Sequence, residues 1–259
     1  MTPHAFVVDA ASVTGRPTGC GALIERASLG AHTDSPGLEL SVLELESDGS
    51  CTRATGGGEE VLFVLSGHGA LRTDGADQPL EPETGAYIPP GSEYALNAPS
   101  DEELLIVAIR VPDPVADIAG RSAGAVVRRL ADQAEAEATA ERSFRIVSDP
   151  DTGLRSGTQF VGYIPPGRAP DHFHTYDEAI YVLDGTGAFH AGGESWMLGP
   201  GSCISLPART IHCLENTGPD VMRVMAVFRP AGSPAAAYYP DGTPAYNNEG
   251  SLHEEEVEA

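Results

Sequence analysis

The sequence predicts an all-β protein built from two repeated units. Gly and Pro supply 51 of its 259 residues (30 Gly, 21 Pro), whereas Phe, Trp and Tyr make up only 6%. Such a composition is typical of short strands separated by turns. The length also fits two compact units, because it exceeds the usual size of one small domain.

An internal repeat supports this division. The repeated segments run from Glu59 to Asn97 and from Asp177 to Asn216. Each contains an acidic residue, a β-branched and aromatic run that ends in Gly, a hairpin, a turn with Gly and Pro, and a further strand pair. Aligning Glu60 with Glu178 places the two segments 118 residues apart.

The segment between the repeats has a different composition. Residues 113–142 are rich in Ala, Arg, Glu and Asp, with apolar residues at helical spacing, which predicts a linker of one short and one longer helix. We therefore expect an N-terminal unit at residues 1–112, a helical linker at 113–142, a C-terminal unit at 143–230 and a tail at 231–259. Tyr238, Tyr239 and Tyr246 are candidates for holding part of the tail on the barrel surface.

Charge and cysteine content restrict the function. The formal charge of −23 argues against nucleic acid or an anionic membrane as a partner. All 15 basic residues are Arg, so a lysine Schiff base is excluded. No leader or membrane-spanning pattern is present, and we expect a cytoplasmic protein. The four cysteines lack CxxC spacing and are expected to be free thiols, with Cys203 and Cys213 buried in strands.

The segment PDHFHTYDEAIYVLDG carries the chemistry. His172 and His174 are two residues apart in an extended segment, so their side chains leave the same face. Glu178 has the same parity and begins the next strand-like run, and His212 enters another strand after the turn ISLPART. These four side chains are expected to bind one divalent transition metal ion per chain inside a barrel. The ligand types suit Fe, Mn, Co, Ni, Cu or Zn and do not choose among them.

These motifs resemble those of the cupin superfamily. His172, His174, Glu178 and Gly185 match the spacing of its first motif, and Gly201, Pro207, His212 and Asn216 match its second, with Arg209 where a Gly is customary. The resemblance implies two tandem double-stranded β-helix (jelly-roll) barrels and activities such as dioxygenation, oxalate breakdown, isomerisation, and lyase or cyclase chemistry.

The N-terminal unit resembles the same fold without a metal site. Ala54 and Gly56 occupy the positions of the first two histidines, Glu60 that of the glutamate and Tyr94 that of the last histidine. We expect this unit to serve packing and assembly, and His68 to be an exposed loop residue.

We expect a metal-dependent enzyme acting on a small molecule. The first hypothesis is a quercetinase-like Fe(II) or Mn(II) dioxygenase that chelates an enol- or diol-like substrate. The alternative is a non-redox isomerase, cyclase, lyase or hydrolase in which Glu178 acts as a catalytic base. A further alternative is a metal-stabilised binding protein without turnover.

Further candidates concern substrate contacts and assembly. Gln159, Tyr163, Arg209 and Phe228 are candidate substrate contacts. Pairing through edge strands predicts a homodimer. The architecture also resembles that of ureidoglycine aminohydrolases. Their C-terminal motif places Glu where this chain has His172, with His and Gln in the last two ligand positions, so their coordination chemistry differs.

Overall fold

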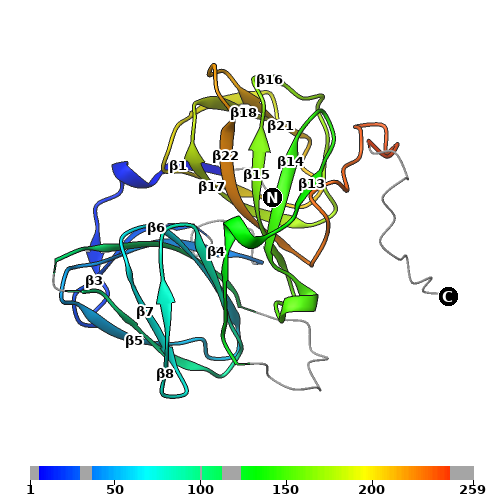
Figure 1. Cartoon of the computed structure of the whole chain (residues 1–259). Helices are drawn as coiled ribbons and strands as arrows, with labels where there is room; N and C mark the ends of the chain where they lie inside the picture. The colour runs from blue at the N-terminus through cyan, green and yellow to red at the C-terminus, as the bar shows by residue number, and fades with distance from the viewer. Residues whose placement is uncertain (1–5, 30–36, 100, 113–123, 246–259) are drawn as a thin grey trace.

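Two β-barrels, each made of a seven-stranded and a four-stranded sheet, form the part of the chain that the structure describes (Figure 1). The structure is a computed structural model, and it describes residues 6–29, 37–99, 101–112 and 124–245. The predicted all-β class and the two cupin-like jelly-roll barrels are confirmed. Among the described residues no helix has the length and apolar character needed to span a membrane.

The N-terminal barrel has one sheet in the order β12-β9-β6-β11-β4-β3-β2 and a second in the order β5-β10-β7-β8. Its strands are β2 (Arg16–Pro17), β3 (Leu23–Leu29), β4 (Glu39–Leu45), β5 (Ser50–Ala54), β6 (Glu59–Ser66), β7 (Gly69–Thr73), β8 (Ala76–Leu80), β9 (Thr84–Ile88), β10 (Glu93–Asn97), β11 (Leu104–Val111) and β12 (Val126–Arg129).

The C-terminal barrel has sheets in the orders β1-β20-β17-β22-β15-β14-β13 and β16-β21-β18-β19. Its strands are β1 (Phe6–Asp9), β13 (Glu135–Glu137), β14 (Ser143–Ser148), β15 (Thr158–Ile164), β16 (Gly167–Arg168), β17 (Asp177–Asp184), β18 (Gly187–Ala191), β19 (Glu194–Leu198), β20 (Ser202–Leu206), β21 (His212–Asn216) and β22 (Met222–Arg229). Three short 3-10 helices, η1 (Ala10–Ser12), η2 (Leu130–Asp132) and η3 (Pro150–Thr152), lie in the connections.

The sequence repeat is a structural repeat. Strands β6, β7, β8, β9 and β11 begin and end 118 residues before β17, β18, β19, β20 and β22. The register agrees as well, because Tyr94 pairs with Thr73 in one barrel and His212 with Ala191 in the other. Tyr94 therefore occupies the position of His212, as the alignment predicts.

Each barrel takes one strand from the segment that leads into the other barrel. Strand β1, at the N-terminus, pairs with β20 of the C-terminal barrel, and β12 pairs with β9 of the N-terminal barrel. Figure 1 shows β1 among the strands of the C-terminal barrel. Strand β1 precedes the N-terminal repeat and β12 precedes the C-terminal repeat, yet each pairs with the other repeat's barrel. This exchange of leading strands covers two sheet edges that would otherwise be open.

The predicted helical linker is wrong where the structure describes it. Residues 124–142 form β12, η2 and β13, and residues 113–123 of that prediction lie outside the described residues. Ala and Glu favour helix locally, but tertiary pairing overrides this propensity. Here β12 completes the sheet next to β9 and β13 completes the sheet next to β14.

The two seven-stranded sheets pack against each other through a shared core. Side chains from the N-terminal barrel, such as Leu40 and Val61, share one hydrophobic cluster with side chains from the C-terminal barrel, such as Met225 and Val227. Hydrogen bonds also cross this interface: the Glu59 carboxylate accepts from the backbone N–H groups of Arg155 and Ser156, at 3.0 Å each. Each barrel has a separate interior core.

The prediction of four free thiols is wrong for two of them. Cys20 and Cys51 form a disulfide, with their Cα atoms 5.3 Å apart, because the turn before β3 lies against β5. The sequence gives no spacing signal for a pair 31 residues apart. Cys203 and Cys213 are free and buried, which confirms that part of the prediction.

In the N-terminal barrel the counterpart of the candidate metal site holds an ion pair. The Glu60 carboxylate accepts hydrogen bonds from the Arg53 guanidinium and the Tyr94 hydroxyl, both at 2.9 Å, and Arg53 Nε donates to Tyr94 Oη at 2.7 Å. Burial raises the pKa of Tyr94 well above its ordinary value, and the Glu60 charge adds to the effect. A protein cation therefore neutralises this glutamate. His68 is exposed, as predicted, and contacts Glu102.

The shared core predicts that the barrels unfold together. Leu40→Ala removes a fully buried side chain of the N-terminal barrel and is expected to reduce the free energy of unfolding by about 2–5 kcal/mol. The same loss should appear in far-UV circular dichroism and in the fluorescence of Trp196, the only tryptophan, which lies in the C-terminal barrel. Val221→Ala, at an exposed position, is the control and should change stability little. An unchanged Trp196 transition in Leu40→Ala would contradict the coupling.

The ion pair in the N-terminal barrel predicts a double-mutant effect. Arg53→Met leaves the buried Glu60 carboxylate without its cation and is expected to destabilise the protein by about 2–3 kcal/mol, because Arg53 is partly exposed. Adding Glu60→Gln removes the unpaired charge and should recover part of the loss. Chemical denaturation of the two single variants and the double variant measures this coupling. Strictly additive losses would show that the pair is not coupled.

Candidate metal centre

Three histidines are brought together by backbone pairing at one end of the C-terminal barrel. His172 and His212 form an antiparallel bridge, with reciprocal N–H to carbonyl distances of 3.0 and 2.8 Å. Residues directly opposite each other in such a bridge project from the same face. His174, two residues after His172, returns to this face. The predicted convergence of the three imidazoles is thus a consequence of strand geometry.

The imidazole rings are oriented for metal binding. One ring nitrogen of each histidine lies within 4.8 Å of those of the other two. The Nδ1 atoms of His172, His174 and His212 lie 2.9 Å from the backbone carbonyls of Pro170, Ala236 and Thr210. A carbonyl only accepts, so each Nδ1 carries the proton and each Nε2 keeps its lone pair. Carbonyl partners of this kind fix the tautomer of metal-binding histidines.

Burial keeps the cluster uncharged. Desolvation lowers the pKa of His174 to about 4, with a smaller contribution from His172. Desolvation likewise lowers the pKa of His172 and holds that of His212 well below its ordinary value. Neutral imidazoles are the form that binds a metal ion. Three neutral imidazoles whose Nε2 lone pairs face one cavity form a donor set that divalent transition metal ions prefer, so the residues fit such an ion.

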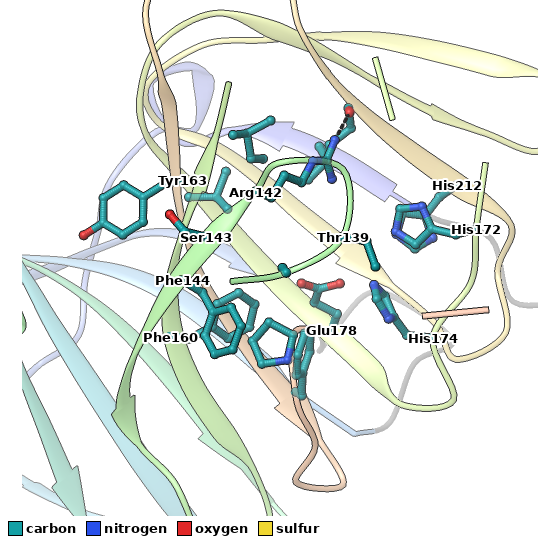
Figure 2. Close-up of a pocket in the computed structure, with 17 residues that line it drawn as sticks. Thr139, Arg142, Ser143, Phe144, Phe160, Tyr163, His172, His174, Glu178 and His212 are labelled. Carbon is teal, nitrogen blue, oxygen red and sulfur yellow. Dashed lines mark hydrogen bonds between the residues drawn. The ribbon is translucent and has the colours of Figure 1, made fainter. Parts of the chain in front are cut away.

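Glu178 lies in the same cavity but outside the tight histidine group. It is the second residue of β17, and its alternation with Ile180 and Val182 turns it into the barrel. Among the described residues no protein group donates a hydrogen bond to its carboxylate, and burial raises its pKa to about 8. Figure 2 shows the carboxylate in the cavity near the histidines. Glu178 can therefore complete a ligand set or handle a proton.

Two segments outside the repeated region close the cavity. The loop 138–142, between β13 and β14, contributes Thr139 and Arg142. The tail contributes Pro234 to the lining, and its Ala236 carbonyl orients His174 from behind. Figure 2 shows this loop crossing the cavity beside Glu178 and the histidines. The walls between them are apolar and consist mainly of Phe144, Phe160, Ile164, Leu214, Val224 and Phe228.

The tail is held by its own pairing with the barrel. The backbone of Tyr238 bridges Phe173, between the two histidines of the first motif, and the two rings stack with centroids 5.5 Å apart. The Tyr176 hydroxyl donates to the Ser233 carbonyl at 2.7 Å. Tyr238 thus holds the tail as proposed from the sequence, Tyr239 is partly exposed, and Tyr246 lies outside the described residues.

Of the four candidate substrate contacts, Phe228 and Tyr163 line the cavity, and Gln159 and Arg209 do not. Phe228 is buried against His174 and lines the cavity. Tyr163 borders the cavity, but its ring points away from the histidines (Figure 2) and lies near the Arg145 and Arg223 guanidiniums. The Gln159 amide donates to the Leu62 carbonyl in the N-terminal barrel, away from the cavity.

Arg209, the fourth candidate, is exposed and does not line the cavity. Its φ of 62° is a left-handed conformation that suits the glycine customary at this position of the motif. Its backbone N–H donates to the His174 carbonyl at 2.7 Å. The backbone of Arg209 therefore supports the first motif, while its side chain faces solvent.

Sequence reasoning missed the cavity residues Thr139 and Arg142, because both fell within the supposed helix. A longer repeat gives the available signal: Val7 and Val8 precede η1, just as Val126 and Val127 precede η2. These pairs continue the repeat into the segment assigned to a helix, which argues against a helix at that place.

Comparisons with known proteins agree with this architecture. The cupin domain family model matches residues 41–110 and 160–228. Similar solved structures include protein Ylba from E. coli (TM-score 0.73, 13% identity, 88% of this chain and 92% of that one). A protein from Pseudomonas aeruginosa described as glyoxylate induced has a TM-score of 0.72 and 17% identity over 88% and 89% of the chains. A variant of Bacillus subtilis oxalate decarboxylase has a TM-score of 0.68 and 13% identity over 91% and 79%.

At these identities the solved structures show the fold alone, and no curated protein matches the sequence. The family model, in contrast, matches both barrels and more than half of the chain. Its second matched segment contains all three clustered histidines and Glu178. This chain therefore belongs to the cupin domain family.

Proposed function

We propose that this protein is a metal-dependent enzyme acting on a small molecule, and that it is a dioxygenase using Fe(II) or Mn(II). The observation that carries the proposal is the convergence of three Nε2 lone pairs in a buried cavity, each fixed by a backbone carbonyl on Nδ1. His172, His174 and His212 would hold the ion. When bound, the ion would polarise an enol- or diol-like substrate and leave coordination positions for dioxygen.

The protein supplies the surroundings that this chemistry needs. Phe160 and Phe228, whose rings lie 4.6 Å apart, limit the access of water to the apolar side of the cavity. The Glu178 carboxyl group lies in the cavity, receives no hydrogen bond from the part of the chain that the structure describes, and has its pKa raised to about 8 by burial. A carboxyl group with this pKa can donate a proton near neutral pH and can take one from an enol as the pH rises toward 8.

One observation favours a second candidate, a non-redox isomerase, cyclase, lyase or hydrolase. Glu178 lies outside the tight histidine group, so its carboxylate is available as an acid or base without displacing a ligand. Such chemistry needs an ion that polarises the substrate and a base beside it, and no oxidant. The two candidates differ in their requirement for dioxygen.

The metal proposal predicts the stoichiometry and affinity of metal binding. Elemental analysis of protein purified without added metal should find about one Fe or Mn per chain. His174→Ala removes a ligand and should weaken binding more than about 100-fold, since even the loss of a residue behind a ligand costs about 10–100-fold. His68→Ala, outside the cluster, is the matched control and should bind normally. Failure of the wild-type protein to bind any of the six candidate metals after reconstitution would exclude a metal centre.

The oxygenase proposal predicts oxygen consumption that depends on Glu178. Fe(II)- or Mn(II)-loaded protein should consume dioxygen with an enolic substrate, as measured with an oxygen electrode and a panel of small enols. Glu178→Gln should reduce kcat by about 10²–10⁴-fold while retaining most of the bound metal. Substrate turnover at the same rate without dioxygen would instead support the non-redox candidate.

A further inference from the structure

Arg142 is a partly buried cation on the wall of the candidate metal cavity. It ends the loop 138–142, and its side chain extends over the cavity toward β21 (Figure 2). Its Nη2 donates to the Leu214 carbonyl at 2.6 Å. Desolvation lowers the pKa of Arg142, but a guanidinium remains protonated in proteins. A positive charge is thus held where the apolar walls give little compensation.

No carboxylate of the described chain lies within 4.0 Å of the Arg142 guanidinium. Glu178 acts on it only at longer range. The N-terminal barrel differs, because there Arg53 contacts Glu60 directly at 2.9 Å. An arginine has five N–H donors, and Leu214 uses one of those of Arg142. The remaining donors are not among the buried polar atoms that lack a partner, so they retain access to open space.

The loop fixes Arg142 at this place. Ala140 and Glu141 both adopt left-handed conformations, with φ of 58° and 57°. The Ala138 N–H donates to the Arg142 carbonyl at 2.7 Å, which closes the hairpin. Left-handed conformations are unfavourable for residues other than glycine. The hairpin backbone therefore has limited conformational freedom, and it holds the Cα atom of Arg142 in a defined position.

We propose that Arg142 is the substrate-anion contact of this cavity and that the substrate is a small organic acid. Its carboxylate pairs with the Arg142 guanidinium, and an enol or hydroxyl oxygen of the same molecule faces the histidines. This assignment deepens the proposed function and rests on it. A bidentate arginine–carboxylate pair in a cavity shielded from water gives both orientation and selection for the charge. The exposed Arg209 lacks this setting.

The test compares two small probes that differ in charge. Glycolate and glycolamide both carry an α-hydroxyl and a carbonyl oxygen, but only glycolate has a carboxylate. Protein loaded with Co(II) is titrated with each probe, and changes in the visible Co(II) spectrum give the dissociation constants. Wild-type protein should bind glycolate at least about tenfold more tightly than glycolamide, as expected for a charge-assisted hydrogen bond. Arg142→Gln should abolish this preference, and Arg142→Lys should retain part of it.

The controls separate failure of the anion contact from failure of the metal site. Arg209→Gln changes the same charge on the exposed surface and should keep the preference for glycolate. If Arg142→Gln keeps the preference, or Arg209→Gln loses it, Arg142 is not the anion contact, while Co(II) binding still supports the metal site. If wild-type protein and His174→Ala bind Co(II) alike, the metal proposal itself fails. Circular dichroism of each variant checks that it is folded.

Discussion

The exchange of leading strands is the constraint on which the rest of the structure depends. Strand β1 completes the C-terminal sheet and β12 completes the N-terminal sheet, so neither seven-stranded sheet is finished by its own repeat alone. The exchange also brings the outer faces of these sheets together over one shared core. The segment after β12 then continues into β13 and the loop 138–142, which reaches the cavity of the C-terminal barrel. The connection between the barrels thereby becomes part of the candidate site.

The two barrels show two ways to accommodate a glutamate at one position. Glu60 is neutralised by Arg53 and by a hydrogen bond from Tyr94. Glu178, at the equivalent position, has no such contacts and faces a cavity with three imidazole lone pairs. Since a buried charge is unfavourable unless it is compensated, one barrel supplies compensation from its own side chains. The other leaves the carboxylate available to a ligand.

The candidate site also depends on residues remote from both motifs. The carbonyl of Ala236, in the tail, fixes the tautomer of His174, and Tyr238 pairs with Phe173 between the two histidines of the first motif. The hairpin loop places the Arg142 guanidinium on the cavity wall from outside both motifs. The motifs thus provide the imidazoles, while the tail fixes the tautomer of His174 and the hairpin loop adds a positive charge to the cavity wall.

The sequence by itself determined the features that follow from local periodicity. The spacing of two residues between His172 and His174 places both on one face of an extended segment. The offset of 118 residues between the repeats makes Tyr94 the counterpart of His212. Only the tertiary structure decided the pairing between distant segments. Val126–Arg129 and Glu135–Glu137 are strands because open sheet edges accept them, although Ala and Glu favour helix locally. The Cys20–Cys51 disulfide and the position of Arg142 in the cavity likewise depend on contacts between distant parts of the chain, which no local pattern encodes.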